Sequence, residues 1–278
     1  MSRPMISLLT DFGLRDPSAA ICKGVILGIT PDAQVIDISH EVRKYAIRDG
    51  ALLLWSALPY LPIGIHVAVV DPGVGTARRA IAMQVARGDT LIGPDNGLLL
   101  PGANRLGGPT AVRQLENERY RLTPVSSSFH GRDVFAPAAA HLAKGARFED
   151  LGRAVPLDEI VRLPFLEATV KPGILESAVV YIDTFGNVKL AGTRVELEEA
   201  LGPVRAGDPI EVSIGGPHGR SRATEHTTFE LTFGTVAVGR SLLYEDSYGR
   251  LCLADNQGDL ATRLELSEDQ LLALSRPR

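Results

Sequence analysis

The sequence predicts an α/β N-terminal domain with a Rossmann-like layered sheet, followed by a smaller, mainly antiparallel β domain. Strand-like and helix-like segments alternate through the first half of the 278-residue chain. An apolar run at 65–70 is typical of a strand that is buried on both faces of a parallel sheet. After about residue 170, short β-type runs dominate. We therefore expect one domain at residues 1–169 and a second at residues 170–278.

Hydrophobic spacing places the elements of the first domain. Ile21, Val25 and Ile29 recur at helical spacing, and Ser18 before them suits an N-cap. The expected strands are 6–9, 35–38, 65–70, 80–85 and 90–92, and the expected helices are 19–29, 46–58 and 134–143.

The second domain is marked off by Pro164 and Pro172-Gly173, which punctuate a link. Beyond them the short runs indicate strands, with only two helical segments. The expected strands are 177–182, 188–190, 210–214, 228–233, 241–244 and 251–253, and the expected helices are 196–201 and 267–274.

Composition narrows the classes of function. Hydrophobic residues make up 45% of the chain and charged residues 22%, which is ordinary for a globular protein. The formal charge is −4 with no basic tract, so we expect no nucleic-acid partner. No apolar run has the length of a membrane span, and no signal peptide is evident, so we expect a cytoplasmic protein. Cys22 and Cys252 lie far apart, which favours neither a disulfide framework nor a cysteine zinc site.

Three loops of the first domain carry candidate chemistry. Asp11 follows the first strand, where a carboxylate can bind a ribose diol or an ammonium group; a helix cap with a solvated Asp is the alternative. Asp71 ends an apolar strand and precedes Arg78 and Arg79; a hairpin turn with a surface ion pair is the alternative. His130, in a Ser/Gly loop before a helix, suits an acid, a base or a group that orients water, or else an exposed capping loop.

Two loops of the second domain are weaker candidates. They are the strand end and turn at 182–187 and the hairpin tip at 245–250. Asp and Asn are common turn residues, so a structural role is favoured for both. His40, three residues after Asp37, has no assigned role.

Taken together, the loops resemble the family of S-adenosylmethionine (SAM) hydrolases that form adenosine, which is related to fluorinase and chlorinase enzymes. The resemblance covers nearly the whole chain. It rests on the order and separation of the motifs Thr10-Asp11-Phe12-Gly13, Cys22-Lys23-Gly24, Asp71-Pro72-Gly73-Val74-Gly75-Thr76, Pro94-Asp95-Asn96-Gly97-Leu98-Leu99, Phe129-His130-Gly131-Arg132-Asp133 and Asp183-Thr184-Phe185-Gly186-Asn187.

The resemblance implies hydrolysis of SAM to adenosine and L-methionine, with SAM as substrate, no cofactor and no metal. It also implies a homotrimer whose active sites lie between subunits. Asp71, Arg78 and His130 would hold the nucleophilic water. The implied substrate-binding residues are Asp11 at the ribose diol, Asp16, Asp183 and Ser247 at the methionine end, Phe129, and Phe185 and Asn187 at adenine.

The chain departs from the halogenating relatives at two positions. Their halide-binding hydroxyl residue is replaced by Gly131, which counts against halogenation. Their Arg beside the methionine-binding serine is replaced by Tyr248, which leaves the methionine carboxylate without an assigned partner. The sequence does not choose between Asp71 and His130 as the proton acceptor.

Three alternatives to SAM hydrolysis stay open. They are halide-dependent adenosyl transfer, a metallohydrolase built from Asp11, Asp71 and His130, and a nucleoside- or SAM-binding protein without catalysis. The metallohydrolase lacks the HExxH-type spacing that would make it a strong candidate.

Overall fold

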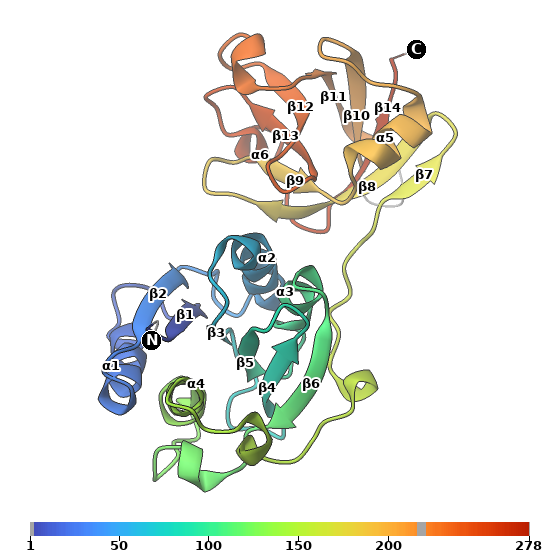
Figure 1. Cartoon of the computed structure of the whole chain (residues 1–278). Coiled ribbons are helices and arrows are strands. Elements are labelled where there is room, and N and C mark those ends of the chain that lie inside the picture. The colour runs from blue at the N-terminus through green and yellow to red at the C-terminus, as the bar shows by residue number, and fades with distance from the viewer. Residues whose placement is uncertain (1–2, 216–220, 278) are drawn as a thin grey trace. The chain divides into compact units, whose positions relative to one another are not determined.

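The chain folds into two compact units, Met1–Leu163 and Pro164–Arg278. We analysed a computed structural model, which describes residues 3–215 and 221–277 (Figure 1). No helix within those residues combines the length and apolar character needed to cross a membrane.

The N-terminal unit is a six-stranded sheet in the order β2-β1-β3-β5-β4-β6, with helices on both faces. Its strands are β1 (Met5–Thr10), β2 (Gln34–Ser39), β3 (Ile65–Val69), β4 (Ala80–Val85), β5 (Thr90–Pro94) and β6 (Pro109–Gln114). Its α-helices are α1 (Ser18–Ile29), α2 (Ile47–Ala57), α3 (Leu100–Arg105) and α4 (Ala136–Ala143). A π-helical turn, Gly131–Phe135, leads into α4, and short 3-10 turns lie at Leu58–Tyr60, Glu118–Tyr120, Phe148–Leu151 and Leu157–Glu159.

The sheet of this unit is mixed. Strands β2, β1, β3 and β5 run parallel, whereas β4 is antiparallel to both β5 and β6. Thr10 at the end of β1 pairs with Val69 at the end of β3, and Leu9 pairs with Ser39 at the end of β2. The loops that follow β1, β2 and β3 therefore leave the sheet at one edge, which is where ligands bind in open α/β sheets.

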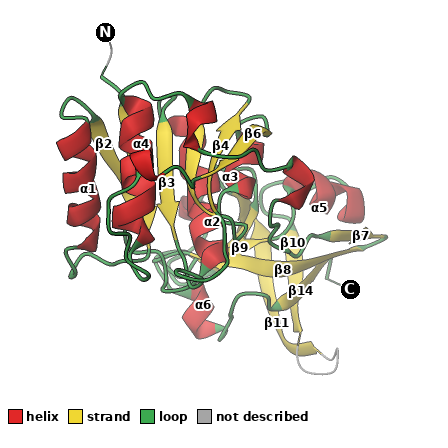
Figure 2. Ribbon diagram, turned by 90° about the horizontal axis from the view of Figure 1, so that it is seen from below, coloured by secondary structure: helices red, strands yellow, loops and turns green. Residues whose placement is uncertain are grey.

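The two faces of the sheet are covered by different helix pairs. Helices α1 and α4 pack together on one face, and α2 and α3 pack together on the other (Figures 1 and 2). Side chains alternate between these faces along a strand. Ile6 and Leu8 of β1 accordingly pack in the cluster that contains Ile26 of α1, while Leu9 lies against Gly50 of α2.

A fully buried polar network ties β1, β3 and the turn before β5 together. The Ser7 hydroxyl lies 2.7 Å from His66 Nδ1, and His66 Nε2 lies 2.9 Å from Asp89 Oδ1. Arg87 donates two hydrogen bonds to the Asp89 carboxylate, and the Gly64 N–H donates a third. Because no side chain of the Ser7–His66–Asp89 set is exposed, the set stabilises the fold and does not meet substrate.

The C-terminal unit is a closed barrel-like sheet. Its strands are β7 (Thr169–Lys171), β8 (Ile174–Ile182), β9 (Val188–Leu190), β10 (Pro209–Gly215), β11 (Ser221–Phe229), β12 (Ser241–Glu245), β13 (Leu251–Asp255) and β14 (Leu271–Ser275). The order is β14-β10-β11-β12-β13-β9-β8-β7, and the pairing of β14 with β8 closes the ring. Its helices are α5 (Arg194–Leu201) and α6 (Leu260–Arg263), with a 3-10 turn at Phe233–Thr235.

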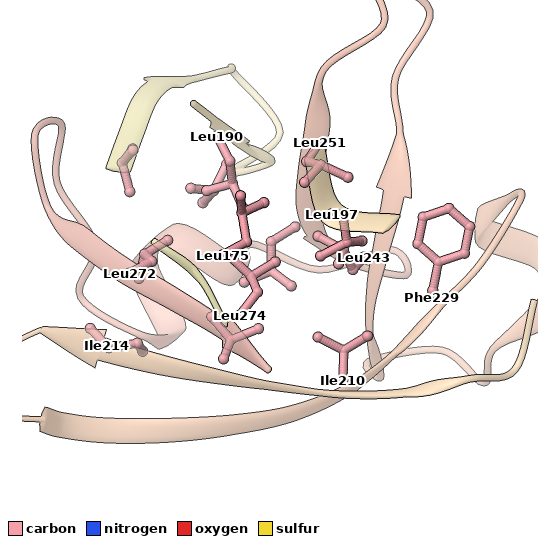
Figure 3. Close-up of a cluster of buried hydrophobic side chains, with 14 of the residues drawn as sticks. Leu175, Leu190, Leu197, Ile210, Ile214, Phe229, Leu243, Leu251, Leu272 and Leu274 are labelled. Atoms are coloured by element: carbon pink, nitrogen blue, oxygen red, sulfur yellow. The ribbon is translucent and has the colours of Figure 1, made fainter. Parts of the chain in front are cut away.

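Antiparallel pairs make up most of this barrel, but β11 and β12 pair in parallel. The interior is filled by aliphatic side chains from most of the strands and by Leu197 of α5, together with the aromatic ring of Phe229 of β11 (Figure 3). The mixed α/β architecture expected from the sequence is therefore confirmed at the level of one α/β unit and one β unit.

Four local expectations were wrong. Residues 267–274 form no helix, because Leu271–Ser275 is the strand that pairs with β10 and β8. The strand expected at 228–233 ends at Phe229. Pro17, not Ser18, is the N-cap of α1, and Asp16 accepts the Ser18 N–H there. The helix expected at 134–143 starts as a π-helical turn at Gly131 and becomes α-helical at Ala136.

Candidate active site

A cavity of about 250 Å³ lies at the sheet edge where β1, β2 and β3 end. Four loops supply its walls: the loop that follows each of these three strands and the loop that precedes α4. The lining residues are Asp11, Phe12, Lys44, Tyr45, Val69, Asp71, Val74, Ser128, Phe129, His130 and Gly131.

Asp71 and Arg78 form a two-pronged ion pair beside this cavity. Arg78 Nε donates to Asp71 Oδ1 at 3.1 Å, and Arg78 Nη2 donates to Asp71 Oδ2 at 2.5 Å. The two side chains are only 4% and 8% exposed, for Asp71 and Arg78 respectively. Such a fork-to-carboxylate contact fixes the orientation of both groups as well as their charge.

His130 joins the pair through its Nδ1 atom, which lies 3.1 Å from Arg78 Nη2. A guanidinium group can only donate hydrogen bonds, so His130 Nδ1 must accept. The ring is therefore neutral in this arrangement and carries its proton on Nε2. His130 is consequently held as a hydrogen-bond donor toward other partners, while Asp71 keeps a lone pair on each oxygen.

One donor of Arg78 is left over. Among the described residues, the buried Nη1 atom of Arg78 has no hydrogen-bond partner. The guanidinium group also lies over the Phe135 ring, with Cζ 5.5 Å from the ring centroid. An unsatisfied buried donor is costly unless a ligand or water accepts from it. Arg78 can thus bind an oxygen atom at this point without releasing Asp71 or His130.

Close backbone packing brings the two loops together. Gly75 has φ +76°, and a Cβ there would collide with the Ser127 carbonyl, so the 71–79 loop approaches the 126–131 loop only with glycine at this place. On the other side, the buried Asp133 carboxylate accepts the Ser126 N–H at 2.8 Å and pairs with Arg132. These contacts hold His130 against Arg78.

Burial perturbs both titratable groups of the triad. Burial raises the pKa of Asp71 above its ordinary value, and the positive charge of Arg78 opposes that rise. Burial, reinforced by the charge of Arg78, lowers the pKa of His130 below its ordinary value of 6.5. The two-pronged contact with Arg78 is that of an ionised Asp71 carboxylate, and the lowered pKa keeps His130 neutral at neutral pH.

These shifts predict a one-sided pH profile. Acid protonates Asp71 and charges His130, and a charged His130 can no longer accept from Arg78. We expect kcat/KM to be flat at and above neutral pH and to fall only when the pH drops below the ordinary histidine value of 6.5, because the His130 pKa lies below that value. Initial rates between about pH 4 and 8 test this. A rate that increases toward acid pH would contradict the assignment of a neutral His130.

Asp11 is oriented by the loop that follows β2. Its Oδ2 atom accepts the Tyr45 N–H at 2.9 Å, which leaves Oδ1 for another donor. Tyr45 has φ +65°, an unfavourable conformation for a residue with a side chain. Tyr45 is 72% exposed and lines the cavity. Such backbone strain is typical of functional loops, and here it aims an N–H group at Asp11.

The C-terminal unit has a second, larger cavity of about 1,060 Å³. Asp183 stabilises the turn at its wall: Oδ1 accepts the N–H groups of Phe185 and Asn187, and Oδ2 accepts from Asn187 Nδ2 at 2.9 Å. Phe185 is 77% exposed. The lining residues are Asp183, Phe185, Asn187, Phe233, Gly234, Tyr244, Asp255, Asn256, Gln257, Gly258 and Asp259.

Most of the candidate residues thus fall into two groups, one at each cavity, and two residues line neither cavity. Asp11, Asp71, Phe129 and His130 line the first cavity, with Arg78 bonded to two of them, and Asp183, Phe185 and Asn187 line the second. Asp16 and Ser247 line neither of these cavities, and both are exposed.

Sequence reasoning missed several wall residues. Lys44 and Tyr45 line the first cavity, and Phe233 and Tyr244 line the second. The first two could have been found from the rule that loops at the carboxyl ends of neighbouring parallel strands gather, since they follow β2. The second pair come from segments that carry no motif.

The geometry bears on two alternatives, namely Arg79 in place of Arg78 and a metal site. Arg79 points away from the triad and pairs with Asp95 and Glu159, so it does not substitute for Arg78. Within residues 3–215 and 221–277, no group of three or more His, Cys, Asp or Glu side chains is arranged to hold a metal ion.

Comparisons with known proteins agree with the motifs. Family models match residues 6–152 as the "SAM hydroxide adenosyltransferase N-terminal domain" and residues 177–272 as its C-terminal domain. The (R)-S-adenosyl-L-methionine hydrolase of Salinispora tropica is 42% identical over 98% of both chains. The fluorinase of Actinopolyspora mzabensis is 30% identical over 99% of this chain and 98% of its own.

A solved structure has the same fold over nearly the whole chain. The crystal structure of an uncharacterized conserved protein from Thermotoga maritima matches with a TM-score of 0.89 and 33% identity, over 98% of this chain and all of that one (100%). With both halves of the chain matched by the models, the protein belongs to the SAM hydroxide adenosyltransferase family.

Proposed function

We propose that this chain hydrolyses (R)-S-adenosyl-L-methionine to adenosine and L-methionine. The observation that carries the proposal is the buried Asp71–Arg78–His130 triad with a spare guanidinium donor, at the wall of the cavity that Asp11 also lines. The 42% identity to a hydrolase of that name supports the substrate and its sulfonium configuration.

The reaction is an in-line displacement at C5′. The water oxygen forms a bond to C5′ while the C5′–S bond breaks, and sulfur takes the electron pair. Sulfur passes from a sulfonium cation to a neutral thioether, so the leaving group needs no acid or metal. Water is the weak partner because it must lose a proton. Holding it in line with C5′ lowers the barrier, by up to about 7–11 kcal/mol in favourable cases.

The proton of water goes to Asp71 in this proposal. His130 Nδ1 is engaged by Arg78, and Nε2 already carries a proton, so the imidazole has no free base. Asp71 is ionised, and burial makes it a better base than an exposed carboxylate. Arg78 Nη1 donates to the water oxygen and stabilises the hydroxide character that develops there. His130 Nε2–H orients the same water.

Asp11 binds the ribose diol in this scheme, through the oxygen that Tyr45 leaves free. That contact exists in the ground state and in the transition state alike. We expect Asp11→Ala to raise KM by about 10–150-fold, the equivalent of 1.5–3 kcal/mol, with little change in kcat. Steady-state kinetics measure both constants. A collapse of kcat at unchanged KM would instead assign Asp11 to the chemical step.

We propose the remaining contacts with SAM on the basis of the family resemblance. Phe129 packs near the ribose, and Phe185 and Asn187 bind adenine. Asp183 orients the Asn187 amide, because a carboxylate can accept only from the NH₂ end and so leaves the amide oxygen for the adenine amino group. Asp16, Asp183 and Ser247 bind the methionine end.

We also propose a homotrimer with active sites shared between neighbouring subunits. The residues proposed for ribose and water precede residue 135, and those proposed for adenine follow residue 180. Solution scattering combined with an activity assay tests the assembly. A fully active monomer would exclude shared sites.

Halide as nucleophile is disfavoured by the packing around Gly131. A Cβ at this position would lie 3.1 Å from Phe12 Cζ and 3.4 Å from a ring carbon of Phe129, so there is little room for the hydroxyl residue that halogenating relatives carry. Phe12 and Phe129 stack edge to face, with centroids 5.8 Å apart. The negative charge of Asp71 also repels an anion.

The direct test is an incubation of metal-stripped protein with each sulfonium epimer of SAM, followed by chromatography of the products. Adenosine and methionine from the R epimer are the expected products. Both epimers bound tightly but recovered unchanged would favour a binding protein without catalysis.

A further inference from the structure

His40 is buried beneath the ribose-binding loop, although nothing in the proposed reaction uses it. The residue is 4% exposed and follows β2. Its Nδ1 atom lies 2.8 Å from the hydroxyl of Thr10, the last residue of β1, and its Nε2 atom lies 3.1 Å from Asp37 Oδ1. Asp37 in turn accepts from Lys23 Nζ of α1 at 2.5 Å.

The contacts of His40 form a chain with a defined direction. His40 Nε2 faces the Asp37 carboxylate at 3.1 Å without hydrogen-bond geometry. A carboxylate there favours the tautomer with the proton on Nε2, which leaves Nδ1 as an acceptor. The Thr10 hydroxyl must then donate to Nδ1. Its oxygen keeps lone pairs, and one of them accepts the Phe12 N–H at 3.3 Å. The His40 side chain thus fixes the orientation of the Thr10 hydroxyl, which in turn contacts the backbone of Phe12.

Backbone contacts hold the same two loops together on either side of Asp11. The Gly13 N–H donates to the His40 carbonyl at 2.7 Å, and the Val42 N–H donates to the Thr10 carbonyl at 3.3 Å. Asp11 therefore lies between two residues, Thr10 and Phe12, whose positions depend on the His40 side chain. Its carboxylate is then within reach of the Tyr45 N–H, at 2.9 Å.

We propose that His40 is a positioning residue for the ribose diol, acting through Thr10 to aim the Asp11 carboxylate. This inference rests on the proposed role of Asp11. It predicts that loss of the Thr10–His40 contact weakens recognition of the two ribose hydroxyls and leaves recognition of the rest of the nucleoside intact.

The test compares two nucleosides by isothermal titration calorimetry, adenosine and 2′,3′-dideoxyadenosine. The wild type is expected to bind adenosine about 10–100-fold more tightly, since a charge-assisted diol contact has this strength. Thr10→Val keeps the shape of the side chain and removes the hydroxyl. We expect it to reduce the preference to about 3-fold or less, with the affinity for dideoxyadenosine unchanged.

Three further variants complete the design. Thr10→Ser restores a hydroxyl and is expected to restore the preference. Asp37→Ala changes the partly exposed end of this set of contacts, where the side chain is 42% exposed, and is expected to weaken the preference partially. Asp32→Ala removes an exposed carboxylate just before the same strand and serves as the matched control, with an unchanged preference.

Equal weakening of both nucleosides in Thr10→Val, or an unchanged preference, would overturn the proposal. A wild type that does not distinguish the two nucleosides would overturn it as well. Failure of the proposed reaction is a separate result, because binding needs no turnover. A protein that binds adenosine with the expected preference but does not hydrolyse SAM would refute the reaction and leave the role of His40 standing.

Discussion

Arg78→Met is expected to lower kcat by about 10²–10³-fold, the usual effect of removing one preorganised electrostatic group. Arg78 orients Asp71, holds His130 neutral and offers Nη1 to the nucleophile, so three functions are lost together. None of them involves the nucleoside, so KM is expected to change by less than about 3-fold. Single-turnover rates with saturating substrate measure the effect.

Arg79→Met is the matched control. It removes the neighbouring guanidinium group, which pairs with Asp95 and Glu159 and not with the triad. We expect near-normal kcat. Arg78→Lys keeps the charge but cannot reach Asp71 and His130 with a planar fork, so an intermediate rate is expected. Because the triad acts as a unit, Asp71→Asn combined with Arg78→Met should cost less than the sum of the two single changes. Wild-type turnover in Arg78→Met would dismiss the triad.

Asp89→Asn is expected to lower the free energy of unfolding by about 3 kcal/mol, the lower end of the range for breaking a buried ion pair. The lower end applies because the Arg87 side chain is 25% exposed and water can solvate it, whereas His66 is fully buried. For a domain of this size the loss corresponds to a melting temperature about 6–12 °C lower. Asp89 lines neither cavity, so kcat of the folded variant should be unchanged.

The sign of the pH dependence gives this prediction a second readout. Burial alone would raise the pKa of Asp89, but hydrogen bonds from His66 and Arg87 outweigh burial and hold it below its ordinary value. A depressed pKa stabilises the fold above the unfolded value near 3.8 and loses that contribution as the pH falls further. The difference between wild type and Asp89→Asn should therefore shrink in acid. Asp32→Asn, at an exposed carboxylate, is the control and should change stability by less than about 0.5 kcal/mol.

The placement of Asp71 could be anticipated because it follows from topology, whereas its grouping with Arg78 and His130 was implied by the family resemblance. Asp71 stands at the end of an apolar strand, and the carboxyl ends of parallel strands meet at one edge of the sheet. The sequence alone could not separate Arg78 from Arg79. In the structure, adjacent side chains of this extended segment point in opposite directions, one toward Asp71 and the other toward Asp95.

Elements whose conformation depends on distant pairing could not be read locally. Residues 267–274 contain three leucines together with Glu268, Gln270 and Ala273, all of which favour a helix. In the structure, Leu271–Ser275 pairs with β10 and with β8, and the pairing with β8 closes the barrel. Strand β8 lies almost a hundred residues earlier in the chain. Burial of Leu272 and Leu274 inside the barrel outweighs the local preference. Strand β6, which pairs with β4, was not predicted for the same reason.

Wall residues with no motif were also out of reach. Tyr45 donates its backbone N–H to Asp11 from a left-handed conformation. A tyrosine in the sequence gives no signal for such a conformation. His40 could be noticed but not assigned, because its partner Thr10 is 30 residues away. Both become interpretable only when the loops after β1 and β2 are seen to lie together.

The central claim is that water, held by Asp71, Arg78 and His130, attacks C5′ of SAM. It is tested most directly by running the reaction in ¹⁸O-labelled water with high chloride, and separately with fluoride, followed by mass spectrometry of the nucleoside product. We predict adenosine that carries one solvent ¹⁸O atom at the 5′ position, with the same yield whether or not halide is present. A 5′-halo-5′-deoxyadenosine as the dominant product, or adenosine without the label, would contradict the account.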